Sequence, residues 1–133
     1  MIDTRERLAP EEVLIAIAHE LPKRRKSFKY TPKVNRFFRE RQGAFPELLG
    51  HWKLLDDNSA RCSDLTSALA HLRNGGAIFV SQKTPTQYNF TDLGERDYHG
   101  TIEPKLSPRD KIQLHILSCQ FDRHISTYTE YRI

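Results

Sequence analysis

The sequence predicts a single domain, residues 1–133, that is mainly α-helical and carries one small β-hairpin. The chain is long enough for one domain, and 38% of its residues are hydrophobic, which is enough to build a core. Apolar residues recur at helical spacing through most of the chain, whereas residues 77–91 change to a β-rich pattern around a turn. The chain has no apolar run of about 20 residues and no secretory signal, so we expect a soluble, cytoplasmic protein.

The first predicted helix occupies residues 10–22. Pro10 and the two glutamates after it suit a helix start, because proline lacks a donor that the first turn cannot use and acids favour the positive helix end. The pattern leaves open whether this helix belongs to the core or forms an added arm. After a connector over residues 23–29, a second helix is predicted from Pro32 to Gly43. Its inner stripe consists of Val34, Phe37, Phe38 and the stem of Arg41.

A third and a fourth helix precede the hairpin. The third opens at Pro46 and ends before the polar run that starts at Asp56, and the fourth begins after a cap at Ser63 and stops at Gly75 and Gly76. The residues spaced for burial are Leu48, Leu49, Trp52 and Leu55 in the third helix and Leu65, Ala68, Leu69 and Leu72 in the fourth.

The hairpin consists of strands over residues 77–81 and 88–91, joined by a turn-rich tip. Thr91 is expected to cap a brief helix that ends near Tyr98, and an irregular link follows to residue 105.

The last predicted helix, residues 107–128, opens with a serine cap, a proline and an acid at the third position. Its wheel has two apolar faces, which indicates burial on both sides, although a helix wholly inside a monomer has the same pattern. We expect a homodimer, and the stripe predicted to form its interface is Leu114, Leu117, Phe121 and Ile125. The opposite stripe is Ile112, Ile116 and Cys119.

Three helices, the last ending at a Gly-Gly pair, followed by a short hairpin are in the order of a winged helix. Residues 65–98 also resemble winged helix-turn-helix proteins of the PadR, HxlR and MarR type, in which a helix ending "L..L...G.I" precedes the wing and "Y.[FL]T..G" follows it. The matching positions are Leu69, Leu72, Gly76, Ile78, Tyr88, Phe90, Thr91 and Gly94. The resemblance implies a winged helix at 23–98, with an extra N-terminal helix and a long C-terminal helix for dimerisation.

The charge is unevenly distributed along the chain. Residues 23–41 contain nine Lys or Arg and one Glu, a charge of +8, whereas the rest of the chain carries −4. A cationic block of this kind favours a polyanion, so we expect a DNA-binding protein, a transcriptional regulator or a DNA-binding subunit. The residues expected to contact DNA are Lys23, Arg24, Arg25, Lys26, Lys29, Lys33, Arg36, Arg39, Arg61, Thr66, Ser67, His71, Arg73 and Lys83.

The fourth helix is poor in the side chains that read bases, which leaves an alternative open. The chain would then be a winged-helix adaptor without sequence-specific DNA binding, such as an accessory subunit, an antitoxin-like neutraliser or a phage-type inhibitor, whose cationic block meets an acidic protein or RNA. No catalytic triad, phosphate loop or dinucleotide motif is recognisable, so no enzyme activity and no cofactor are expected. The histidines are scattered, and the pair His115 and Cys119 is too little for a metal site, so no metal is expected either.

Overall fold

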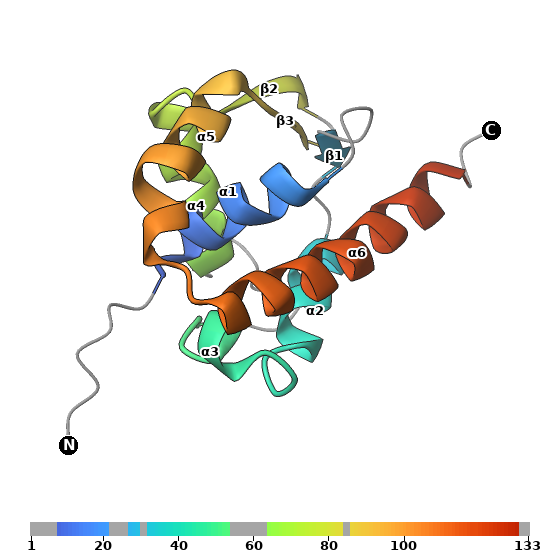
Figure 1. Cartoon of the computed structure of the whole chain (residues 1–133). Helices are drawn as coiled ribbons and strands as arrows, with labels where there is room; N and C mark the ends of the chain where they lie inside the picture. Colours follow the sequence, from blue (N-terminus) through green and yellow to red (C-terminus); the bar gives the residue numbers. More distant parts are fainter. Residues whose placement is uncertain (1–7, 22–26, 30–31, 54–63, 84–85, 131–133) are drawn as a thin grey trace.

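The computed structural model describes residues 8–21, 27–29, 32–53, 64–83 and 86–130. Helices pack around one hydrophobic core, with a small antiparallel sheet at one end (Figure 1), so the predicted class, mainly α with a small hairpin, is confirmed. The elements are α1 (Pro10–Glu20), β1 (Ser27–Lys29), α2 (Pro32–Glu40), α3 (Pro46–Leu49), α4 (Asp64–Asn74), β2 (Ile78–Lys83), β3 (Thr86–Phe90), α5 (Asp92–Asp97) and α6 (Pro108–Glu130). None of the helices in these segments is both long enough and apolar enough to span a membrane.

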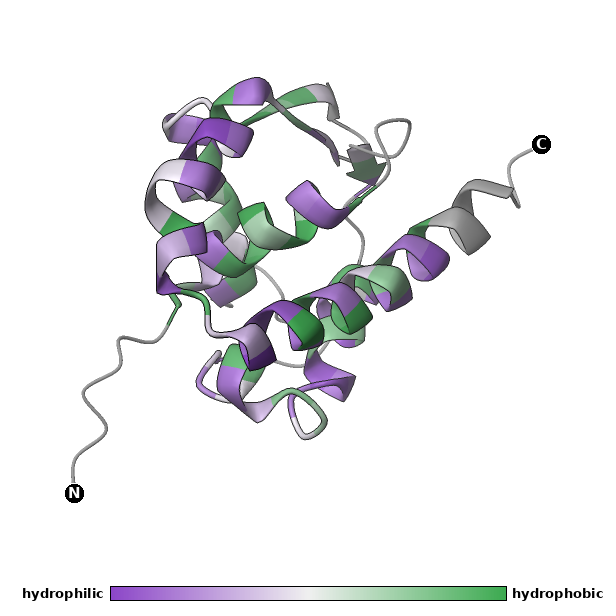
Figure 2. Ribbon diagram, viewed as in Figure 1, coloured by the Kyte–Doolittle hydropathy of each residue, from purple (hydrophilic) through white to green (hydrophobic). Residues whose placement is uncertain are grey.

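Helix α1 lies at the centre of the fold. Glu12 Oε1 accepts the backbone N–H of Ala9 at 2.9 Å, which stabilises the start of the helix. All residues from Val13 to Ala18 are buried, because α4, α5 and α6 cover different sides of the helix (Figure 2). The predicted N-terminal helix is therefore part of the core and not an added arm.

The third predicted helix is shorter than expected. It ends at Leu49, and the prediction that it continues to Leu55 is wrong. The side-chain amide of Gln42 donates hydrogen bonds to the carbonyls of Leu49 and Trp52, at 2.9 and 2.8 Å, so these carbonyls have partners without further helical turns. Leu48, Leu49 and Trp52 are nevertheless buried as predicted, and Leu55 lies outside the described residues.

An aromatic cluster joins α2, β1 and α6. The ring of Phe121 in α6 lies 5.5 Å from Phe28, 5.3 Å from Phe37 and 5.6 Å from Phe38, measured between centroids. Phe38 also contacts Trp52 at 5.3 Å. All five side chains are buried, and such pairs add stability beyond the area they bury.

The sheet contains a strand that the sequence did not predict. Residues 27–29, expected to be a connector, form β1, which pairs with β3 so that the strand order is β1-β3-β2. Phe28 stands opposite Tyr88 and is buried against Phe90 as well as Phe121. The predicted hairpin of β2 and β3 is confirmed.

The junction between α4 and the sheet depends on Gly76. This residue has a φ of +85°, a conformation that costs other residues about 1–2 kcal/mol. The hydroxyl of Thr91 donates to the Gly76 carbonyl at 2.7 Å, and the backbone N–H of Thr91 donates to the Ala77 carbonyl at 2.9 Å. Thr91 occupies the N-cap position of α5 as predicted, but its side chain makes no capping hydrogen bond to that helix. It connects the two ends of the hairpin instead.

The segment after α5 is helical, which corrects the predicted irregular link. Residues Tyr98–Ile102 form a π-helix, η3, and residues Glu103–Lys105 form a 3₁₀ turn, η4. Tyr98 and Ile102 are buried, and Lys105 Nζ lies 2.7 Å from Glu12 Oε2 in α1. These contacts hold residues 98–105 against the start of α1, so the segment has a regular helical backbone and is not an irregular loop.

Helix α6 starts as predicted. The backbone N–H of Asp110 donates to Ser107 Oγ and the backbone N–H of Ser107 donates to Asp110 Oδ2, both at 3.0 Å.

The two apolar faces of α6 differ in burial, which corrects the predicted dimer interface. The stripe predicted to meet a partner lies in the chain's own core: Leu114, Leu117, Phe121 and Ile125 are all buried. The stripe that stays at the surface contains Ile112, 61% exposed, and Ile116, 41% exposed. A homodimer through α6 remains a prediction, and it would have to use this second stripe.

Candidate functional site

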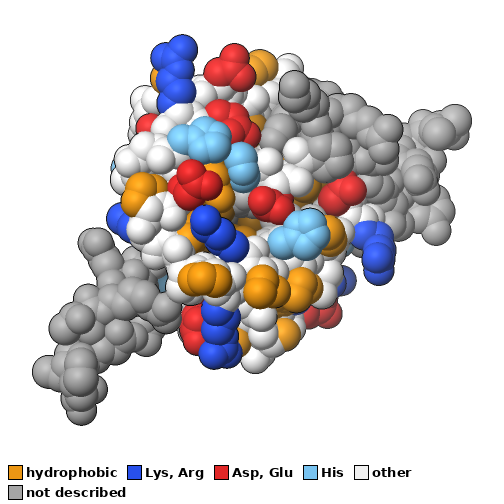
Figure 3. All heavy atoms as spheres, in the orientation of Figure 1, with side chains coloured by type: hydrophobic (Ala, Val, Ile, Leu, Met, Phe, Trp, Pro, Cys, Tyr) orange, Lys and Arg blue, Asp and Glu red, His pale blue; other side chains and the backbone are white. Residues whose placement is uncertain are grey.

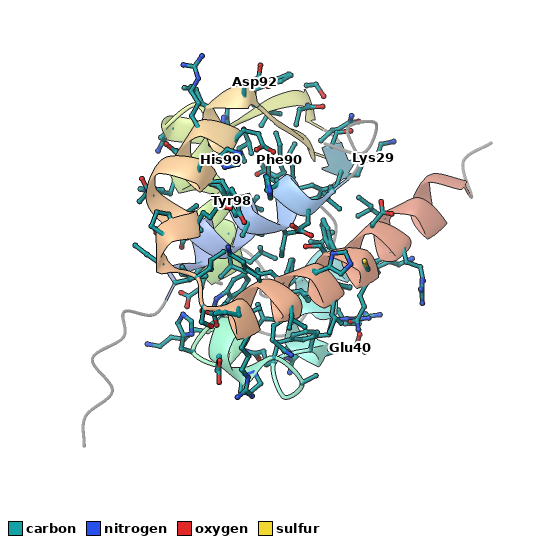
Figure 4. All side chains as sticks on the ribbon, in the orientation of Figure 1. Lys29, Glu40, Phe90, Asp92, Tyr98 and His99 are labelled. Carbon is teal, nitrogen blue, oxygen red and sulfur yellow. The ribbon has the colours of Figure 1, made fainter. Side chains whose placement is uncertain are left out.

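Apart from Arg41, the described cations of the block are Lys29 in β1 and Lys33, Arg36 and Arg39 in α2, and we call this set the β1–α2 surface. The three residues from α2 are exposed on its outer face, because Val34, Phe37 and Phe38 turn the other face into the core. Figure 4 shows Lys29 beside the sheet and Glu40 at the far end of α2, so the surface runs from the sheet along the helix.

The outer face of the sheet continues this surface. Since Phe28 points into the core, its neighbour Lys29 points outward, and the register places Lys29 opposite Gln87 and Gln87 opposite Gln82. Asn89, on the same face, donates to Ser81 Oγ at 2.8 Å. The three strands contain no Asp or Glu, so lysine is the one charged residue type in them. Phe79, which stands opposite Asn89 and is 53% exposed, adds an apolar side chain to the same face.

Arg41, the last cation of the block, has a structural role. Its Nε donates to Gln120 Oε1 in α6 at 2.7 Å, and its Nη1 donates to the Phe37 carbonyl at 3.0 Å. The guanidinium carbon lies 3.8 Å from the centroid of the Phe37 ring, and burial lowers the pKa of Arg41. The charge of Arg41 is thus used to join α2 to α6.

Helix α4 carries four of the predicted contact residues. Ser67 and Arg73 are exposed and Thr66 is half-buried. His71 is exposed as well, but it lines a cavity of about 320 Å³ whose other walls include Glu11, Glu12 and Asp97. The side of α4 that carries His71 therefore faces carboxylates, which disfavours a phosphate there.

Some of the predicted residues cannot be placed. Lys23, Arg24, Arg25, Lys26 and Arg61 lie outside the described residues, and Lys83 stands opposite Thr86 near the hairpin tip.

Acidic side chains gather over α1, α5 and η3. Figure 3 shows this face, where acidic and histidine side chains lie together and hydrophobic side chains follow below them. The acidic residues of these elements are Glu11, Glu12, Glu20, Asp92, Glu95 and Asp97, with Glu103 directly after η3. Positive charge is therefore concentrated at β1 and α2, and negative charge at α1 and α5.

A cluster of His19, Glu95 and His99 on this acidic face was not predicted. Glu95 and His99 are four residues apart, a spacing that places them on one side of a helix and could have been noticed. His19 is separated from Glu95 by 76 residues, and only the packing of α1 against α5 brings its Nδ1 to 2.9 Å from Glu95 Oε2.

We expect the stability of the fold to decrease in mild acid because of His124. The His124 ring lies 5.0 Å from that of Phe37. Burial is the main cause that lowers the pKa of His124 below the ordinary value of 6.5, and the charge of Arg41 lowers it further. Glu40 raises this pKa and Lys33 lowers it, both by smaller amounts. The folded chain then binds fewer protons than the unfolded chain between the lowered pKa and 6.5, so stability is lost as the pH falls through that range.

Urea unfolding at about pH 7.5 and about pH 5.5 measures this effect. In the variant His124→Gln, the difference between the urea midpoints at the two pH values should become smaller. In the variant His71→Gln, which changes an exposed side chain of α4, the difference should stay the same. An equal difference in all three proteins would contradict the assignment to His124.

Comparison with protein-family models, curated proteins and solved structures finds no match to this chain, so its function is argued from its own residues.

Proposed function

We propose that the chain binds double-stranded DNA, with the β1–α2 surface and the hairpin against the phosphate backbone, as a transcriptional regulator or a DNA-binding subunit. The observation that carries the proposal is the register of β1 with β3. It joins the cationic block to the hairpin, because Lys29 stands opposite Gln87 of β3 and the exposed cations of α2 follow β1 directly in the chain.

The topology supports the same reading. Helices α1, α2 and α4, with the four-residue helix α3 between the last two, precede the β2–β3 hairpin, and β1 lies in the chain between α1 and α2. This is the order of elements in a winged helix, the class that residues 65–98 resemble. In such a protein α4 would approach the major groove and the hairpin would be the wing.

The charges favour phosphate contacts over base readout. Arg73 is the one Lys or Arg of α4, and the side of that helix that carries His71 faces carboxylates. Lys and Arg contacts to phosphates position a protein on DNA without reading its sequence. We therefore expect modest discrimination between DNA sequences.

A protein-interaction adaptor is the second candidate, and one observation favours it. Ile112 and Ile116 are exposed on α6, next to an acidic face, so the surface offers an apolar strip that DNA would not use. If the chain is an adaptor, the β1–α2 surface would bind an acidic protein.

Titration of a labelled DNA duplex by fluorescence anisotropy, at several salt concentrations, tests the proposal. If about five phosphates are neutralised, the logarithm of the binding constant should fall with the logarithm of the salt concentration at a slope of about −4 to −5. Absence of binding at low salt, or a slope near zero, would leave the adaptor as the better description.

A further inference from the structure

We propose that His19, Glu95 and His99 bind a divalent transition-metal ion, with zinc as the preferred ion. This goes beyond DNA binding, because none of the three residues belongs to the β1–α2 surface or to the hairpin. His19 stands one residue before the end of α1, and Glu95 lies in α5. His99 lies in the π-helix η3, next to Tyr98 (Figure 4). Among the residues that the structure describes, this is the one group of three or more potential ligands in close range.

The distances fit a metal ion. Glu95 Oε2 lies 2.9 Å from His19 Nδ1 and 3.6 Å from His99 Nε2, and one ligand atom of each residue lies within 4.8 Å of the other two. Zinc bonds to nitrogen and oxygen of about 2.0–2.2 Å in a tetrahedral arrangement require ligand atoms about 3.3 Å apart. The two measured separations lie on either side of that value.

The rings are held in place before any ion arrives. His19 is stacked on Tyr98, with ring centroids 3.8 Å apart and an angle of 12° between the planes. His99 Nδ1 lies 3.4 Å from Glu103 Oε1, so a carboxylate stands behind the nitrogen that faces away from Glu95. A carboxylate beside the nitrogen that does not bind the metal fixes the orientation of a metal-binding imidazole. The π-helix is a further sign, because such turns occur frequently at functional sites.

The surroundings favour a cation. Carboxylates lie next to both rings: Glu95 Oε2 is 2.9 Å from His19 Nδ1, and Glu103 Oε1 is 3.4 Å from His99 Nδ1. Two imidazoles and one carboxylate suit zinc and the neighbouring transition metals, whereas calcium and magnesium prefer oxygen ligands only.

The site is accessible and leaves room for a further ligand. His19 and Glu95 both line a cavity of about 580 Å³ between α1 and the junction of β3 with α5, together with Phe90 and Asp92. Three protein ligands leave one position of a four-coordinate zinc for water or for a small ligand in that cavity.

Zinc titration of the full-length chain, stripped of metal with a chelator, tests the proposal by calorimetry. The expected stoichiometry is one zinc per chain. The side chain of His99 is 59% exposed, so His99→Ala should keep the fold. It should weaken zinc binding by more than about tenfold, since losing a ligand costs at least as much affinity as losing the carboxylate that orients it.

Glu103→Gln tests the positioning residue. We expect it to keep one zinc per chain but to weaken binding by about 10- to 100-fold, while the melting temperature of the metal-free protein stays unchanged.

The matched control is His115→Ala. His115 is an exposed histidine of α6 whose Nδ1 lies 2.8 Å from Glu20 Oε1 and whose Nε2 lies 3.7 Å from Cys119 Sγ. Zinc binding should be unchanged in His115→Ala. The parent protein loaded with cobalt should show no thiolate charge-transfer band, because Cys119 is not a ligand. Loss of binding with His115→Ala, retention of full affinity with His99→Ala, or absence of zinc binding would each overturn the proposal.

Discussion

Replacing Phe121 by alanine is expected to lower the free energy of unfolding by about 3–5 kcal/mol. The ring is buried and contacts Phe28, Phe37 and Phe38, so its removal opens a cavity where β1, α2 and α6 meet. The structure around it can collapse little, because three elements hold the remaining rings apart. Urea unfolding of Phe121→Ala against the parent protein measures the loss.

The control is Ile116→Ala on the opposite stripe of α6. This side chain is exposed, so its replacement should change stability by no more than about 0.5 kcal/mol. Light scattering adds a second readout. If Phe121 belonged to a dimer interface, the Phe121→Ala variant would change in mass and hardly in monomer stability, and that result would contradict the burial described above.

Removing the three α2 charges together, with Lys33→Gln, Arg36→Gln and Arg39→Gln, is expected to produce the largest loss of DNA binding. Each phosphate contact contributes about 0.9 to the salt slope, so the magnitude of the slope should fall by about 2 to 3, with a large loss of affinity at low salt. All three side chains are exposed, and the fold should keep its stability within about 0.5 kcal/mol for each change.

A matched variant removes the same charge elsewhere: Arg96→Gln, Arg109→Gln and Lys111→Gln. These exposed residues lie in α5 and in the first turn of α6, away from the β1–α2 surface. We expect a small change in affinity from the lower net charge and nearly the parent salt slope. Equal losses in the two triple variants would show that net charge, and not the β1–α2 surface, determines binding.

Helix boundaries were largely predictable because their signals are local. Pro10 opens α1, Ser107 and Asp110 cap α6 reciprocally, and Gly76 ends α4 with a positive φ. Each signal acts through hydrogen bonds or torsion angles within a few residues, so it can be read without knowing the fold. The end of the third helix was predicted wrongly, because that end depends on hydrogen bonds from Gln42, a residue before the helix.

Strand β1 could not be predicted in the same way. Its three residues are too short for a periodic pattern, and its hydrogen bonds join residues around Phe28 to residues around Tyr88. Long-range pairing of this kind depends on how α2 and α4 fold between the two strands.

The candidate sites show the same division. Lys33, Arg36 and Arg39 were predictable as surface residues, because the apolar stripe of α2 leaves them on its solvent side. The set of His19, Glu95 and His99 was not predictable, because His19 comes from α1 and the other two come from α5 and η3, far along the chain.

The sequence alone determined the helical class, most helix boundaries, the hairpin and the residues that carry its positive charge, since these follow from local hydrogen bonding and from the period of apolar residues. Only the tertiary structure decided that α1 is buried on all sides, that β1 joins the hairpin, and which apolar face of α6 meets the core. The two faces of α6 look alike in the sequence. Periodicity shows which residues share a face, but burial depends on which other elements pack there, and that is a property of the whole chain.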